Sequence, residues 1–205
     1  MYYGERFNAI SHLVGAVLAL SGSVLLVVRT LLAGDRLALI GVLIYSATLV
    51  LLYSISTAYH SVRGRLKGIL RKLDHQAIYL LIAGSYTPFC LITLRDDWGL
   101  GLLGGVWALA AIGMLQEMRS RSKARVLSLL IYLAMGWVAL LVIRPLIARL
   151  GEVGFAWLAL GGLLYTVGIV FFVFDERFRH WHGIWHLFVV AGSAVHFAVI
   201  FFYVV

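Results

Sequence analysis

Seven long stretches of this chain contain no Asp, Glu, Lys or Arg, and each is at least 18 residues long. A helix needs roughly 20 apolar residues to cross the hydrocarbon core of a bilayer. The stretches therefore predict seven transmembrane helices, with almost no sequence left over for a soluble domain. They cover residues 7–28, 37–62, 75–94, 98–116, 126–143, 153–174 and 180–205.

The composition excludes a soluble protein. Hydrophobic residues make up 62% of the 205 residues and charged residues 13%, whereas a soluble domain carries about 25% charged residues. A β-barrel would alternate in polarity over strands of about ten residues, and these continuous runs do not. We therefore predict an all-α integral membrane protein, with one seven-transmembrane domain over residues 1–205.

The first stretch follows only Arg6 and lacks a small-residue cleavage site, so we expect a retained helix. Cys90 is the only cysteine, which excludes an internal disulfide and a cysteine-based metal site.

The basic residues are distributed unevenly between the two ends of the predicted helices. Lys and Arg favour cytoplasmic loops, and with seven spans one side carries 12 of them and the other side 5. This bias predicts a cytoplasmic N-terminus, with Val205 outside, in a multi-pass protein of the plasma membrane; the compact size suggests a bacterial inner membrane. We expect the basic loops to contact anionic membrane lipids rather than nucleic acid. The 12 are Arg6, Arg63, Arg65, Lys67, Arg71, Lys72, Arg119, Arg121, Lys123, Arg125, Arg177 and Arg179.

Polar residues gather at the predicted cytoplasmic ends of three spans, and ionisable groups inside a membrane mark function by default. His182 and His186 are four residues apart, so they lie on one helix face and can share a metal ion. With His60, which follows Ser56 by four residues, they offer three neutral nitrogen ligands, the number that a catalytic zinc takes beside its water. Asp74 would then lie beside that water or orient a histidine. The alternative is a set of interfacial histidines in the head-group zone.

These residues belong to three separated motifs, Ser56-Thr57-Ala58-Tyr59-His60, then Asp74-His75, then His182-Gly183-Ile184-Trp185-His186. Their order and spacing resemble the hemolysin III family, which is grouped with the progestin and adipoQ receptors and more distantly with the alkaline ceramidases. The opening segment with Glu5, Asn8 and His12 also resembles that family. The chain lacks the long N-terminal region of the animal receptors, which disfavours a receptor.

The resemblance implies a zinc ion (Zn2+) held by His60, His182 and His186 near the cytoplasmic face. It also implies that Asp74 reaches the zinc through a water and that Ser56 lies beside the site. The superfamily is thought to include lipid amide hydrolases, so the resemblance extends from the metal to a class of reaction.

Three further histidines lie outside this set of ligands. His12 is also at a predicted cytoplasmic helix end, and it is either a fourth ligand or a hydrogen-bond donor behind the ligands. His196 follows His186 by ten residues, about 15 Å along a helix, so we expect a buried core histidine rather than a ligand. His75 points about 100° away from Asp74 on an ideal helix, which favours an interface residue.

Together these observations favour a zinc-dependent lipid hydrolase, with an amide as the expected substrate bond. Zinc with an open position activates water. Asp74 would then accept a proton and return it to the leaving nitrogen, and Ser56 would donate to the developing oxyanion. One alternative is a membrane-homeostasis regulator or receptor-like sensor with a structural zinc. A lytic pore-forming factor is disfavoured, because a pore needs polar groups along its whole path.

Overall fold

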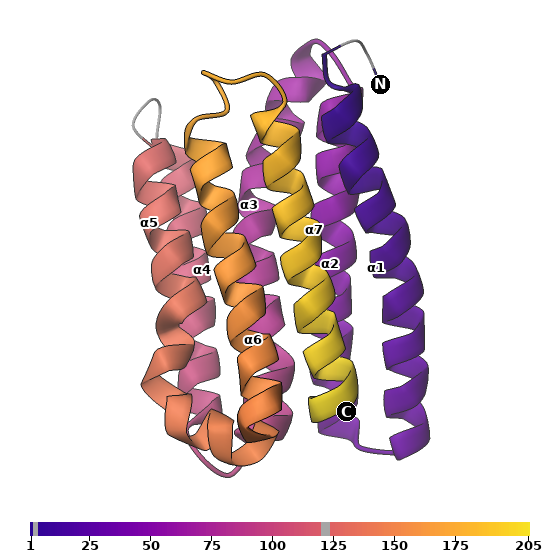
Figure 1. Ribbon diagram of the computed structural model, residues 1–205, viewed down its shortest axis with the longest axis vertical. Coiled ribbons are helices and arrows are strands. Elements are labelled where there is room, and N and C mark those ends of the chain that lie inside the picture. The colour runs from indigo at the N-terminus through magenta and orange to yellow at the C-terminus, as the bar shows by residue number, and fades with distance from the viewer. Residues whose placement is uncertain (2–3, 120–123) are drawn as a thin grey trace.

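The computed structural model describes residues 1, 4–119 and 124–205, and the regular structure in these residues is entirely helical. The helices run along the long axis of one bundle, with the two chain termini at opposite ends (Figure 1). In chain order they are α1 Arg6–Ala33, α2 Arg36–Ser61, α3 Arg65–Pro88, α4 Gly99–Arg119, α5 Ala124–Trp137, α6 Ile143–Val173 and α7 Trp181–Val199. Short π-helical turns extend α3 and α7, over Phe89–Thr93 and Ile200–Val204, and a 3-10 turn over Val138–Val142 follows α5.

Six helical segments in the described residues are long and apolar enough to cross a membrane. One of them, Val126–Val173, is 48 residues long and contains two of the stretches that the sequence predicts as separate spans. Its backbone leaves helical geometry at Gly151, where φ is 71° and ψ is 167°. The indole of Trp137 in α5 donates to Thr166 Oγ1 in α6 at 3.1 Å, so these two helices pack side by side (Figure 1).

Two helices begin earlier than the charge-free stretches predict. The sequence predicts a helix that starts at about Asp74, but α3 begins at Arg65 and places Asp74 more than two turns inside it. Basic side chains such as Lys67 can extend their apolar stems along a helix and keep the charge in the head-group zone, so the helix continues where the hydrocarbon stops. Similarly, α6 includes Pro145, which a helix accepts in its first turn.

The connection between α1 and α2 is short and well capped. Gly34 ends α1 with a φ of 76°, in the left-handed region that glycine adopts without steric cost. The carboxylate of Asp35 accepts hydrogen bonds from the backbone of Leu37 and Ala38, at 2.8 and 3.1 Å, and so caps α2. This tight hairpin holds α1 against α2 over most of their length.

The arrangement of neighbours decides which helix ends meet. α2 packs between α1 and α3, and α7 packs against both α6 and α1. The beginning of α1, the end of α2 and the beginning of α7 therefore lie together at the end of the bundle that carries the N-terminus (Figure 1). Two of the basic residues in the predicted charge bias, Arg121 and Lys123, lie outside the described residues.

Candidate metal centre

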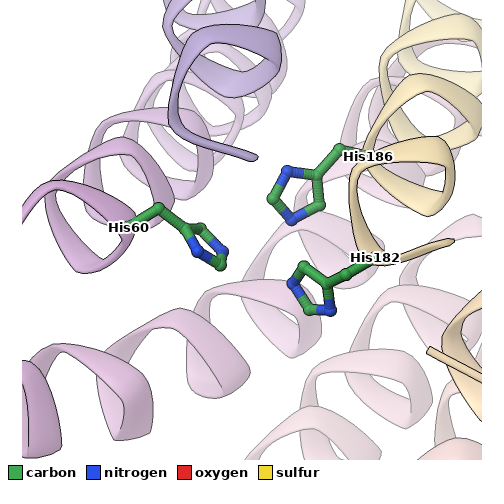
Figure 2. Close-up of side chains that lie close together, drawn as sticks. All are labelled: His60, His182 and His186. Atoms are coloured by element: carbon green, nitrogen blue, oxygen red, sulfur yellow. The ribbon is translucent and has the colours of Figure 1, made fainter. Parts of the chain in front are cut away.

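Three histidines from two helices converge at this end of the bundle. His60 lies in the last turn of α2, and His182 and His186 occupy the first two turns of α7. Each offers one ring nitrogen to a set in which all three atoms lie within 4.8 Å of one another. The ring centroids are 4.7–5.1 Å apart, and the rings face a common space (Figure 2). The sequence prediction that these side chains meet is confirmed.

One nitrogen of each ring is held by an acceptor from elsewhere in the chain. His60 Nδ1 lies 2.7 Å from the carboxylate of Glu5, and His182 Nδ1 lies 2.6 Å from the carboxylate of Asp175. His186 Nδ1 lies 3.1 Å from the backbone carbonyl of Asn8. The hydroxyl of Ser11 also lies 3.1 Å from His186 Nδ1, and it donates its own proton to the carbonyl of Asn8. Because carboxylates and carbonyls only accept hydrogen bonds, these contacts favour the neutral tautomers that carry the proton on Nδ1.

The other nitrogen of each ring therefore carries a free lone pair. The Nε2 atoms of His60, His182 and His186 are buried and have no hydrogen-bond partner among the described residues. Three neighbouring lone pairs that face one space are suited to bind a common electrophile. A divalent cation that prefers imidazole, such as zinc, fits this donor set.

Glu5 connects the N-terminal segment to two helices. Its carboxylate accepts from His60 and, at 2.6 Å, from Lys67 near the start of α3. The amide of Asn8 adds a third hydrogen bond at 2.9 Å. Burial raises the pKa of the Glu5 carboxyl, but the hydrogen bonds from His60, Lys67 and Asn8 outweigh it and hold this pKa well below its ordinary value. Glu5 is therefore ionised at neutral pH and places a fixed negative charge behind His60.

The two predicted catalytic residues are buried close to this set. Asp74 on α3 is 7% exposed, and its carboxyl group interacts electrostatically with His60 and His182. Ser56 lies one turn before His60 on α2 and is 1% exposed. Its hydroxyl interacts with the carboxyl group of Asp74, so the two predicted catalytic side chains lie next to each other.

The remaining histidines lie outside the group of three. His12 stacks face to face on His186, with ring centroids 3.6 Å apart, but its nitrogens do not join the shared set. His196 is half-buried, and its Nε2 lies 3.1 Å from the carbonyl of Leu158, so it is hydrogen-bonded in the bundle away from the three histidines. His75 faces α4, where its Nδ1 lies 2.9 Å from Glu117, in agreement with an interface role.

A cavity of about 200 Å³ extends from this end of the bundle between α3, α5, α6 and α7. Asp74 and His12 line it near the histidines, and Phe89 and Leu94 line it at the far end of the α3 segment. Asp74 and Phe89 are fifteen residues apart, about 22 Å along a helix. The wall is mostly apolar, so the cavity suits a hydrocarbon chain better than a hydrated ion.

Comparison with known proteins identifies the family. The family model described as "Haemolysin-III related" matches residues 2–197. The chain belongs to the haemolysin III family. It is 41% identical to "Hemolysin-3" of Bacillus cereus over 201 residues, which are 98% of this chain and 91% of the relative. It is 40% identical to the "Hemolysin-3 homolog" of Bacillus subtilis (strain 168) over 202 residues, 98% and 94% of the two chains.

A more distant similarity reaches the animal proteins of the superfamily. The chain is 34% identical to the human "Monocyte to macrophage differentiation factor" over 213 residues, which cover 98% of this chain and 84% of the relative. The resemblance predicted from the three sequence motifs is therefore confirmed. Membership of the haemolysin III family and the six long apolar segments together indicate a multi-pass membrane protein.

Sequence reasoning missed the groups that hold the ligand rings in this haemolysin III family member. Glu5 and Asn8 carry the family resemblance, but the motifs give them no role, and Asp175 lies in a loop counted only for its basic neighbours. One signal was available. The chain has only nine acidic residues, so an acidic residue close in sequence to a predicted helix end that carries a histidine, such as Asp175 before His182, marks a candidate partner.

Proposed function

We propose that this haemolysin III family member is a zinc-dependent lipid hydrolase, acting on amide-linked lipids at the cytoplasmic face of the membrane. The observation that carries the proposal is the set of three unpartnered Nε2 atoms, each on a ring whose Nδ1 is fixed by an acceptor. Such acceptors orient metal-binding histidines and fix their tautomer. His60, His182 and His186 would hold the ion.

The donor set favours zinc with an open position. Three neutral imidazoles are the protein ligands of known catalytic zinc sites, and no cysteine can complete a closed site because Cys90 is buried elsewhere on the bundle. When bound, zinc supplies Lewis-acid polarisation of a carbonyl and activation of water. The chain's own groups would supply the remaining chemistry.

Two buried residues have the chemistry that hydrolysis of an amide needs. The carboxylate of Asp74 would take the proton from the attacking water and deliver it to the leaving nitrogen, acting first as a base and then as an acid. The hydroxyl of Ser56 would donate a hydrogen bond to the carbonyl oxygen as negative charge develops on it. Both residues are buried, which excludes bulk water from these transfers.

The cavity supports a lipid as the substrate. Its length of about 22 Å exceeds half of the hydrocarbon core, about 15 Å, so an acyl chain could lie inside it with its polar end at Asp74. A membrane lipid would then be both the substrate and the main partner of the protein. Nothing in this arrangement calls for nucleic acid.

The topology completes the proposal. We take α5 and the part of α6 after Gly151 as separate crossings, which gives seven spans. The bias of the basic residues supports a cytoplasmic side for the N-terminus and the histidines, with Val205 outside. In a bacterial cell this membrane would be the inner membrane.

The test uses purified protein in detergent or lipid, with metal content and lipid hydrolysis measured on the same samples. The wild type should contain about one zinc and release fatty acid from lipid amides. His186→Ala should lose both metal and turnover. His180→Asn is the matched control, because it removes a histidine six residues away and asparagine tolerates the positive φ of 67° at that position. Normal turnover in His186→Ala would refute the proposal.

A second candidate is a membrane regulator in which the metal is structural. It is favoured by the way the ligands tie the end of α2 to the start of α7, since an ion bound only by the native state stabilises it. Asp74→Asn separates the two candidates. In a hydrolase this variant keeps its metal and loses about 100-fold or more of its turnover, whereas a regulator with a structural metal has no turnover to lose.

A further inference from the structure

His12 lies directly against the candidate metal centre without belonging to it. Its ring is 2% exposed and stacks on His186, with centroids 3.6 Å apart and planes 14° apart. The edge of Tyr53 packs against the same ring at 5.1 Å. The position of His12 on α1 is therefore fixed by one stacked contact and one edge contact, both of which an apolar aromatic ring could make.

Neither nitrogen of His12 has a hydrogen-bond partner among the described residues. A neutral imidazole carries one N–H donor and one acceptor, and burying both without partners costs stability. A fourth-ligand role does not explain them, because the nitrogens lie outside the shared set of three. The packing of the ring therefore makes no use of its two polar nitrogens.

The cavity supplies the place where this polarity can be used. His12 and Asp74 both line it, among walls that are mostly apolar. His60, His182 and His186 are not among its lining residues, and His12 is the lining residue that stacks on one of them. A lipid whose chain fills the cavity and whose polar end lies toward the three histidines would have that end next to the His12 ring. An amide N–H can donate to the acceptor nitrogen of an imidazole, and an amide carbonyl can accept from its N–H. An ester carries acceptors and no donor.

We propose that His12 is a substrate-binding residue that hydrogen-bonds the amide group of a lipid held in the cavity, and so favours lipid amides over esters. This inference rests on the proposed function in one respect, that the cavity takes the lipid chain. The binding role of His12 does not require that the protein hydrolyses the lipid. His12 acts on the ligand and leaves the metal to the other three histidines.

The test is a binding measurement on full-length protein with metal bound. The probes are ω-bromoundecanamide and methyl ω-bromoundecanoate, whose bromine quenches tryptophan on contact, and Trp137 and Trp185 line the cavity. The wild type should bind the amide more tightly than the ester. His12→Phe keeps an aromatic ring on His186 and removes both nitrogens, so amide affinity should fall about tenfold while ester affinity stays the same.

Two further readouts separate ligand binding from a structural role. The metal content of His12→Phe should equal that of the wild type, and its melting temperature should be unchanged or higher, because buried polar atoms without partners have been removed. His12→Gln, which keeps a donor and an acceptor, should retain most of the preference for the amide. Ile82→Val changes the apolar wall of the same cavity and should weaken both probes equally.

The outcomes that overturn the inference are distinct from those that overturn the hydrolase. Unchanged amide affinity in His12→Phe, an equal loss for both probes, or a wild type that binds neither probe would each refute the role of His12. A wild type that shows the amide preference but hydrolyses no lipid would refute the hydrolase and support the binding role.

Discussion

The two ring nitrogens of each of the three histidines have different contacts. The contact of Nδ1 affects how strongly Nε2 would bind a metal ion. Two of the three Nδ1 atoms face carboxylates, from Glu5 and Asp175, and the third faces the carbonyl of Asn8. Carboxylates raise the basicity of the ring and offset part of the charge of a divalent ion. These carboxylates would therefore favour the binding of a cation at the proposed site.

Glu5→Gln tests this arrangement at a single atom. The amide keeps the shape of the side chain and removes the charge behind His60, so metal affinity should fall about 10- to 100-fold, as measured by competition with a coloured chelator. Asp35→Asn is the matched control, because it neutralises a carboxylate at the other end of α1 and asparagine still caps α2. Equal affinity in both variants would show that the Glu5 charge has no part in the site.

The sequence could predict the ligands but not the groups that orient them. His182 and His186 are related by local helix geometry, and the motif order links them to His60. The contact between Glu5 and His60 spans 55 positions, and it depends on how α1 leans against α2. The stacking of His12 on His186 also follows from that packing, so sequence reasoning left the role of His12 open.

At the scale of elements, the site depends on the close approach of α1 and α7. Gly183 makes that approach possible, since a Cβ atom there would meet the ring of Phe7 and would lie 2.9 Å from Asn8 Oδ1. Asn8 is also the residue whose carbonyl holds His186. The distance between these two helices therefore sets the position of a ligand ring.

Gly183→Ala should push the start of α1 away from α7. We expect a loss of about 1–3 kcal/mol in stability from overpacking and weaker metal binding, measured by thermal unfolding with and without a chelator. Gly104→Ala, on a face of α4 where a Cβ would meet nothing within 4 Å, should leave both unchanged. A stable Gly183→Ala variant with normal metal binding would contradict the close-approach argument.

A second link between elements lies deeper in the bundle. The hydroxyls of Tyr53 in α2 and Tyr165 in α6 both lie 2.8 Å from Ser193 Oγ in α7. Ser193→Ala should leave the hydroxyl of Tyr165 without this partner, whereas Tyr53 keeps a hydrogen bond to the carbonyl of Val189 at 3.2 Å. We expect the free energy of unfolding to fall by about 1–3 kcal/mol. Ser85→Ala, whose hydroxyl donates to Leu81 within its own helix, should cost less in the same denaturation assay.

The element boundaries show where sequence reasoning stops. Charge-free stretches indicate which residues contact the hydrocarbon of the bilayer. They therefore located the apolar middle part of each helix well. They placed the start of α3 nine residues late, because the helix from Arg65 to Asp74 lies beyond that core. The helical break at Gly151 falls in residues 144–152, between the fifth and sixth charge-free stretches, so the charged residues there did mark its position.

At the scale of the whole molecule, the proposed seven-span topology predicts which loops face which compartment. In a Cys90→Ala background, cysteines at Asp96 and Arg179 would lie at opposite ends of the bundle. A membrane-impermeant thiol reagent added to intact cells should label the Asp96→Cys variant and label Arg179→Cys only after lysis. Labelling of both variants in intact cells would contradict the three membrane crossings that the proposed topology puts between positions 96 and 179.

The span of the site along the chain has a consequence for biogenesis. The groups that hold the three rings and the rings themselves run from Glu5 to His186, so the first and last helices both contribute. If the three histidines hold a metal as proposed, a nascent chain that has inserted only its early helices would possess one of them, His60, and would not retain the ion. Capture of the metal would therefore report that synthesis and insertion have reached the final helix, and a chain truncated before α7 would be distinguishable to the cell by its empty state.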